Sequence, residues 1–456
     1  MSAKRFIGVI EVSKTNAKFV VVDLDKRTEV ATRRMPNKVV VDGPYPHFDV
    51  EGLWRFFKKA IAELNREHPL DALSVTTHGA CAALIDEAGE LALPVLDYEY
   101  AGPDSCDADY ALVRPDFTES FTPPLPGGLN LGKQLFWQQR EFPREFARTQ
   151  WVVPYPQYWS FRLTGVVSAE ITSLGCHTDL WNFETDLYSS LVLAQGWIGK
   201  MPEVKPAAEP LGPVQPELAQ ELGLRPGLPV YSGIHNINAS LLPHILSREP
   251  PFAVVSTGTW VIVAAPGGDL AHLDPTRDCL ANIDALGHPV PSARFMGGRE
   301  FALLTGGAAI EPTAATIARV LERGIFLLPS VVEGSGPYPQ RKARWSHARE
   351  TLDAETVYVT ASFYLAMMTA ECLALAGAEG DIVVEGPFAG NKAFLAMLEA
   401  AACRPVIASL TSTAGRAIGA AMLARMEPGT PPPPVALNAD PEMMRYAWRW
   451  RQALGV

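Results

Sequence analysis

The sequence lacks the cysteine patterns of zinc-binding and disulfide-rich proteins. Its six cysteines in 456 residues stand singly, with no CxxC pair and no Cys/His cluster at zinc-ligand spacing. We therefore expect reduced cysteines with a structural role.

A basic stripe and a long apolar run are also missing. Lys and Arg number 39 against 50 Asp and Glu, which gives a net charge of -11 at pH 7. We therefore expect no nucleic-acid partner, because phosphate neutralisation needs clustered basic residues. Gly, Pro or a charge interrupts the apolar stretches before the roughly 20 residues of a membrane span, so we expect no membrane partner. The start shows no signal peptide, and we expect a cytoplasmic protein.

The composition that remains is that of a soluble globular protein. Hydrophobic residues make up 48% and charged residues 20% of the chain, which is too apolar for a disordered protein. At about 100 to 200 residues per domain, this length predicts two or three cores.

The N-terminal segment predicts a β-hairpin that opens an α/β domain. Apolar residues at 6–12 and 19–22 flank the polar turn Ser13–Asn16. Helical spacing over 53–64 and a strand at 73–76 follow, which gives the order strand, strand, helix, strand.

The segment 102–132 is rich in Pro, Gly, Asp and Thr. This composition predicts a long loop or lid over a site.

The opening pattern recurs about 240 residues later, around the hydroxyl-rich turn Ser256–Thr259. Two such hairpins indicate two related lobes. We place the boundary near residues 246–251, so that residues 1–247 form the first lobe and residues 248–456 the second. A long helix over 354–376 is predicted within the second lobe.

The two hairpin turns are candidate phosphate sites. Each offers successive backbone N–H groups with Ser or Thr hydroxyls, and the first adds Lys14, a combination that holds phosphate oxygens. One such turn is usual on a protein surface. Two at equivalent positions favour a nucleotide gripped between opposed turns.

Candidate proton-transfer groups follow two predicted strands. His78 follows one strand, and Tyr231–Asn236 ends another, where α/β sheets bind ligands. A hydroxyl that attacks a phosphoryl group needs a proton acceptor and positioned donors. Each histidine considered alone is more often a core or loop residue.

Taken in order along nearly the whole chain, eight motifs resemble the FGGY carbohydrate kinases, in particular the branch of rhamnulokinase-like and fuculokinase-like ketose kinases. These motifs are Ile7-Gly8-Val9 through Lys18, Thr77-His78-Gly79, Phe161-Arg162-Leu163-Thr164-Gly165, Leu211-Gly212-Pro213-Val214, Gly233-Ile234-His235, Ser256-Thr257-Gly258-Thr259-Trp260, Glu385-Gly386-Pro387-Phe388 and Ala414-Gly415-Arg416-Ala417-Ile418-Gly419-Ala420-Ala421.

The resemblance implies an α/β fold of two RNase H-like (actin-like ATPase) lobes with a central cleft. It also implies a magnesium-dependent kinase that phosphorylates a ketose or related sugar hydroxyl with ATP. The implied contacts are Lys14, Thr15, Asn16, Thr257, Gly258 and Thr259 for the phosphates, Gly386, Pro387, Phe388 and Asn391 for adenosine, and His78, Gly79 and His235, with Asp97, Tyr98 and Glu99 in a looser match, for the sugar.

Three positions depart from the family pattern. Asn236 stands where the family has the Asp base, Glu11 where it has an Asp that reaches the hydrated Mg²⁺, and Ser13 where it has Gly. General-base catalysis contributes about 10²- to 10⁴-fold, whereas positioning and electrostatic stabilisation remain without it. The sequence therefore predicts binding of both ligands with slowed transfer.

Several alternatives stay open at this point. Asn236 is either natural or engineered, and Asp97 or His235 could replace the base. The rival hypothesis is a non-catalytic sugar and nucleotide binder, a pseudokinase. The partner is a small-molecule sugar that the sequence does not name, and a homodimer is the default oligomeric state.

Overall fold

The computed structural model describes residues 4–409, 415–429, 433 and 435–455. These residues form two compact units. Unit 1 contains the described residues up to 247 together with 281–288 and 415–429, and unit 2 contains the remainder. The sequence-based boundary assigns the two later segments to the second lobe, whereas they pack with unit 1. The motif residue Ala414 lies outside the described residues.

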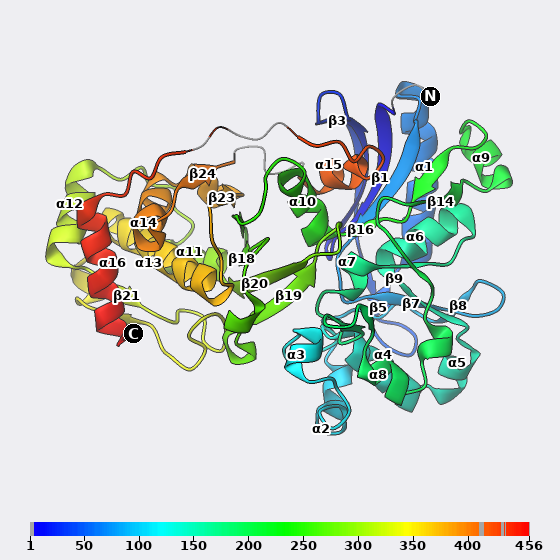
Figure 1. Ribbon diagram of the computed structural model, residues 1–456, viewed down its shortest axis with the longest axis horizontal. Helices are drawn as coiled ribbons and strands as arrows, with labels where there is room; N and C mark the ends of the chain where they lie inside the picture. Colours follow the sequence, from blue (N-terminus) through cyan, green and yellow to red (C-terminus); the bar gives the residue numbers. More distant parts are fainter. Residues whose placement is uncertain (1–3, 410–414, 430–432, 434, 456) are drawn as a thin grey trace. The chain divides into compact units, whose positions relative to one another are not determined.

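Unit 1 is built on a seven-stranded sheet (Figure 1), in the order β14-β15-β6-β1-β2-β3 with β16 also paired to β6. The first three strands along the chain are antiparallel, and β6 is parallel to β1. The strands are β1 (Phe6–Val12), β2 (Asn16–Asp23), β3 (Thr28–Pro36), β6 (Ala72–Thr77), β14 (Pro210–Pro213), β15 (Pro229–Tyr231) and β16 (Ile234–His235).

Both faces of this sheet are covered, which explains why β1 is almost continuously apolar. Ile10 and Val12 pack on one face with α1 (Val50–Glu67) and α6 (Tyr155–Thr164). Ile7 and Val9 pack on the other face with α10 (Asn236–Ile245) and α15 (Gly415–Met422). Figure 1 shows α15 beside β1. The apolar face of α15 therefore draws the 415–429 segment back to unit 1.

The packing of α10 on α15 depends on a glycine. A Cβ on Gly419 would lie 1.7 Å from the Ala239 carbonyl oxygen, which no larger residue tolerates. Ser74 Oγ of β6 also donates to the Ala420 carbonyl at 2.7 Å. These contacts fix α10, whose first residue is Asn236, against the sheet.

A second apolar cluster of unit 1 surrounds a three-stranded sheet and short helices. The segment predicted as a loop at 102–132 contains three short helical segments. Lys133 of α4 pairs with Asp104 and Asp107 and so holds the first two of them against α4. The elements here are β7 (Ala82–Ile85), β8 (Leu91–Leu93), β9 (Trp151–Pro154), η1 (Gly102–Cys106), α2 (Asp107–Tyr110), α3 (Phe117–Ser120), α4 (Leu131–Glu141), α5 (Pro143–Arg148), α7 (Ile171–Leu174) and α8 (Ser190–Ala194). Helix α9 (Pro216–Leu222) packs instead with α1 on the large sheet.

Unit 2 is built on a six-stranded sheet in the order β19-β20-β18-β17-β23-β24. Its strands are β17 (Ala253–Thr257), β18 (Val261–Ala264), β19 (Cys279–Ile283), β20 (Pro289–Phe295), β23 (Ile382–Glu385) and β24 (Val406–Ala408), and its helices are α11 (Gly297–Thr305), α12 (Ala314–Arg323), α13 (Ala354–Leu375), α14 (Lys392–Ala402) and α16 (Pro441–Leu454). The last three residues of β19 are among those assigned to unit 1.

The two sheets share one topology. In unit 1, β1 has the antiparallel strands β2 and β3 on one side and the parallel strands β6 and β16 on the other. In unit 2, β17 has the antiparallel strands β18 and β20 on one side and the parallel strands β23 and β24 on the other. This arrangement confirms the predicted RNase H-like lobes. The turns β1–β2 and β17–β18 occupy equivalent positions in the two sheets.

Helix α13 is the one described helix that is long and apolar enough to cross a membrane by length and composition. Glu355 and Glu371 limit its uncharged run to residues 356–370, in agreement with the sequence-based expectation. However, 83% of its apolar window is buried inside the structure. Its uniform hydrophobicity therefore has an ordinary explanation, because a helix covered on all sides needs no polar face.

Candidate active site

Lys14 of the first turn contacts the acidic residues predicted for the sugar. Its ammonium pairs with the Asp97 carboxylate and lies 3.2 Å from Glu99 Oε2. It also lies 4.9 Å from the centre of the Tyr98 ring. The structure thus brings Lys14 together with Asp97, Tyr98 and Glu99, whereas the neighbouring Thr15 and Asn16 are exposed.

His78 lies where β6 ends beside β1. Its backbone N–H donates to the Val12 carbonyl at 2.8 Å, and its Nδ1 bonds to the Gly79 carbonyl at 2.9 Å. Because a carbonyl only accepts, Nδ1 carries the proton. Nε2 is buried without a partner among the described residues. Burial lowers the pKa of His78 to about 4, so the ring is neutral at pH 7.

Asn236 joins three elements at the same edge of the sheet. Its Oδ1 accepts a hydrogen bond of 2.9 Å from Thr76 Oγ1 in β6, and its Nδ2 donates to the Val12 carbonyl of β1 at 3.2 Å. The side chain is buried at 5% exposure. The position predicted for the base is therefore filled by an amide that connects α10 to both strands.

Glu11 lies on the same face of the sheet. It pairs in register with Thr76, so that the two side chains point the same way, and it is buried at 5% exposure. Its carboxylate lies 3.6 Å from the Lys18 ammonium. A carboxylate oxygen is a ligand that Mg²⁺ prefers, so Glu11 fits the implied metal contact.

His235 precedes Asn236 and is buried with a cysteine and a second histidine. Its backbone N–H donates to Thr172 Oγ1 at 3.0 Å, and its Nδ1 has no partner among the described residues. Burial lowers the pKa of His235 to about 3. Thr172 in turn donates to Glu170, whose pKa burial raises to about 7. His235 is therefore neutral and weakly basic.

In unit 2, Thr257 connects the second turn to the loop before α14. Its hydroxyl donates to the Glu385 carbonyl and accepts from the Phe388 backbone N–H at 3.1 Å. A Cβ on Gly386, whose φ is +84°, would lie 2.0 Å from the Thr257 carbonyl oxygen. Only glycine fits this approach. Gly258 and Thr259 at the turn itself are exposed.

The predicted adenosine residues divide into two groups. Phe388 is buried, and its ring meets Phe301 edge-on at 5.0 Å. Asn391 caps α14 by accepting from the Phe394 backbone N–H at 3.0 Å and lines a cavity of about 800 Å³. A cavity of this size accommodates a drug-sized ligand such as a nucleoside.

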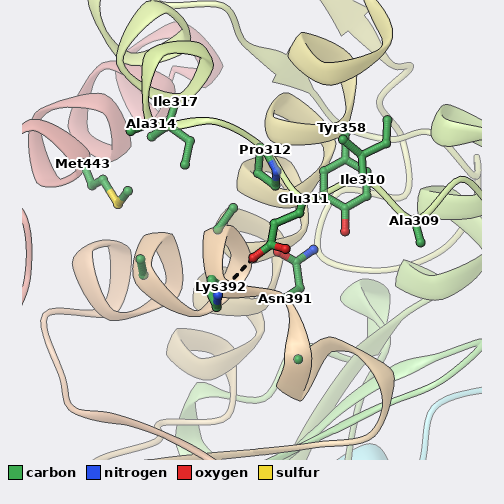
Figure 2. Close-up of a pocket in the computed structure, with 13 residues that line it drawn as sticks. Ala309, Ile310, Glu311, Pro312, Ala314, Ile317, Tyr358, Asn391, Lys392 and Met443 are labelled. Atoms are coloured by element: carbon green, nitrogen blue, oxygen red, sulfur yellow. Dashed lines mark hydrogen bonds and ion pairs between the residues drawn. The ribbon is translucent and has the colours of Figure 1, made fainter.

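Sequence reasoning missed most of the cavity wall (Figure 2). Glu311 and Lys392 form an ion pair of 3.0 Å beside Asn391. The residues that line the cavity are Ala309, Ile310, Glu311, Pro312, Ala314, Ile317, Tyr358, Gly390, Asn391, Lys392, Ala393, Ala396 and Met443. The pair Gly306-Gly307, just before the first wall residue, predicts a loop after α11. The apolar wall residues cannot be told from ordinary core residues in the sequence.

Two family models match consecutive parts of the chain. Residues 6–243 match the N-terminal domain of the FGGY family of carbohydrate kinases, and residues 249–432 match the C-terminal domain of carbohydrate kinase FGGY. The chain belongs to this family. This FGGY membership confirms the resemblance drawn from the eight motifs.

Relatives of this FGGY family member include the L-fuculokinase of Salmonella typhi, which is 24% identical over 58% of this chain and 57% of the fuculokinase. A probable L-xylulose kinase of Pasteurella multocida is 24% identical over 50% of this chain and 49% of the relative. The chain thus spans about half the length of the curated relatives it matches. The crystal structure of a carbohydrate kinase from Novosphingobium aromaticivorans covers 100% of both chains with 32% identity and a TM-score of 0.90.

Proposed function

We propose that this chain transfers the γ-phosphate of ATP to a hydroxyl of a ketose or related sugar. The observation that carries the proposal is the polar edge of unit 1 in a member of the FGGY family. At the carboxyl ends of β1 and β6, Asn236 bonds to Thr76 and Val12, Glu11 lies in register with Thr76, and His78 bonds to Val12. Relatives named fuculokinase and xylulose kinase support a ketose acceptor.

In this proposal unit 1 binds the sugar and unit 2 binds the nucleotide. Lys14, held between Asp97 and Glu99, belongs to the sugar group, since its ammonium is already engaged there. The cavity beside Asn391 takes the adenosine, and the backbone N–H groups of the two exposed turns take the phosphates. Mg²⁺ held through Glu11 would neutralise charge on the transferring phosphoryl group.

We further propose that transfer is slow because no side chain replaces the missing base. His235, with a pKa lowered to about 3 by burial, is too weak a base at neutral pH. The Asp97 carboxylate is held in an ion pair with the Lys14 ammonium. An amide at position 236 cannot take the sugar proton, so positioning and electrostatic stabilisation provide the rate enhancement.

A second candidate function, a sugar and nucleotide binder without turnover, is favoured by the two hydrogen bonds of Asn236. They give the amide a structural role that needs no catalysis. Turnover of a ketose panel with ATP and Mg²⁺ by the parent chain and by Asn236→Asp separates the candidates. Phosphorylation that rises in the variant supports the kinase, whereas two folded, ligand-binding proteins without turnover support the binder.

A further inference from the structure

The fold of unit 1 gathers a cysteine and two histidines that the spacing of the sequence did not connect. Cys176 and His177 follow α7, and His235 ends β16. One potential ligand atom from each lies within 4.8 Å of the other two. Cys176 and His235 are buried, and His177 is partly buried.

Two hydrogen-bonding observations bear on how the ring nitrogens of this cluster could bind a cation. His177 Nδ1 bonds to the Leu129 carbonyl at 2.6 Å, so Nδ1 carries the proton and the lone pair lies on Nε2. Such a carbonyl contact is the usual way in which proteins orient a metal-binding histidine. His235 is 3% exposed, and its buried Nδ1 has no hydrogen-bond partner among the described residues.

Gly79 leaves space in front of both rings. A Cβ at this position would lie 2.9 Å from His235 Nε2 and 3.1 Å from His177 Nε2. Any other residue would crowd the two rings, whereas glycine keeps the space beside them open.

We propose that Cys176, His177 and His235 form a binding site for a zinc-class divalent transition-metal ion. Two imidazoles and a thiolate suit Zn²⁺ or Co²⁺, whereas Mg²⁺ prefers oxygen ligands. Bonds of about 2.0–2.3 Å in a tetrahedron require ligand atoms roughly 3.3–3.6 Å apart. The observed limit of 4.8 Å needs side-chain shifts of about 1 Å.

Binding of the metal ion releases one proton from the protein. The ion forms two bonds to neutral imidazole nitrogens and one to sulfur, and the thiol proton of Cys176 passes to solvent. Three protein ligands leave a fourth position open, as in zinc sites that bind water or substrate.

One consequence rests on the proposed function. His235 belongs to the proposed sugar contacts, so a bound ion and a sugar compete for the same side chain. We expect Zn²⁺ to inhibit sugar phosphorylation in competition with the sugar, while the Mg²⁺ contact at Glu11 is separate.

Cobalt titration of the full chain tests the site without any need for turnover. A Cys403→Ser background removes the exposed thiol, and Cys372→Ser, buried in unit 2, is the matched control. We expect one equivalent of Co²⁺ and a thiolate-to-cobalt charge-transfer band in the parent and the control. Cys176→Ser should lose the band, and His177→Gln should weaken binding at least about tenfold.

Thermal melting of each variant identifies loss of fold. Because His177 is only partly buried, His177→Gln keeps the test decisive if Cys176→Ser does not fold. Cobalt binding without the thiolate band, or unchanged affinity in folded His177→Gln, overturns the site. If the thiolate-to-cobalt band appears but no sugar changes the affinity for Co²⁺, the metal site is supported and only the proposed competition between metal ion and sugar is overturned.

Discussion

Replacing Asn236 by Asp should provide a proton acceptor at a cost in stability. General-base catalysis contributes about 10²- to 10⁴-fold, equivalent to roughly 3 to 5.5 kcal/mol in the activation barrier. The variant keeps the hydrogen bond from Thr76 and loses the donation to Val12. The Val12 carbonyl still accepts from the His78 backbone N–H, so the lost hydrogen bond itself costs about 0.5–1.5 kcal/mol. A buried carboxylate oxygen that faces the Val12 carbonyl adds an electrostatic cost to this.

The assay is ketose-dependent ADP release with thermal melting of the same samples. We expect at least about a hundredfold gain in kcat for Asn236→Asp, little change in sugar affinity and a lower melting temperature. Asn236→Ala is the control, since it loses both hydrogen bonds and gains no base. A folded Asn236→Asp protein that binds both ligands without faster turnover would refute the assignment of position 236.

Three further predictions concern other parts of the site. Lys14→Met should weaken sugar binding more than ATP binding, by about 10- to 100-fold in calorimetry, because Asp97 loses its charged partner; equal effects on both ligands would contradict this. Gly386→Ala should lower the melting temperature and weaken ATP binding, because its Cβ would lie 2.0 Å from a carbonyl oxygen, whereas Gly199→Ala, in unit 1 and with nothing within 4 Å, should do neither. Glu170 has a folded-state pKa raised by burial to about 7 from 4.5, so the unfolded state binds fewer protons, and its stabilising contribution should be lost as pH rises from about 4.5 through 7. Melting curves of the parent and Glu170→Gln should show the parent's relative advantage shrinking over that range, and a constant difference would refute it.

The hairpins and the lobe topology were predictable because their signals are local. Strand β1 alternates between two covered faces, with Ile7 and Val9 toward one cluster and Ile10 and Val12 toward the other. A run of apolar residues ended by a polar turn predicts this hairpin without knowledge of the rest of the chain.

The assignment of distant segments to one unit or the other was not predictable from local signals. The 415–429 segment joins unit 1 because Gly419 lets α15 approach Ala239 closely, and this contact links residues far apart in the sequence. The cluster with His235 escaped detection for the same reason. Cys176 and His177 are adjacent, but their third member arrives only when β16 pairs with β6.

The proposed binding and transfer steps depend on side-chain identity to different degrees. Phosphate held by a turn depends mainly on backbone N–H groups, so exposed residues such as Thr15 and Thr259 leave binding tolerant of substitution. Proton removal depends on one atom at position 236, where an amide nitrogen now faces Val12. A single substitution can therefore separate ligand binding from phosphoryl transfer while the sheet edge stays hydrogen-bonded. This separation is why an intact cavity beside Asn391 fits both the slow kinase and the binder, and why turnover by the Asn236→Asp variant decides between them.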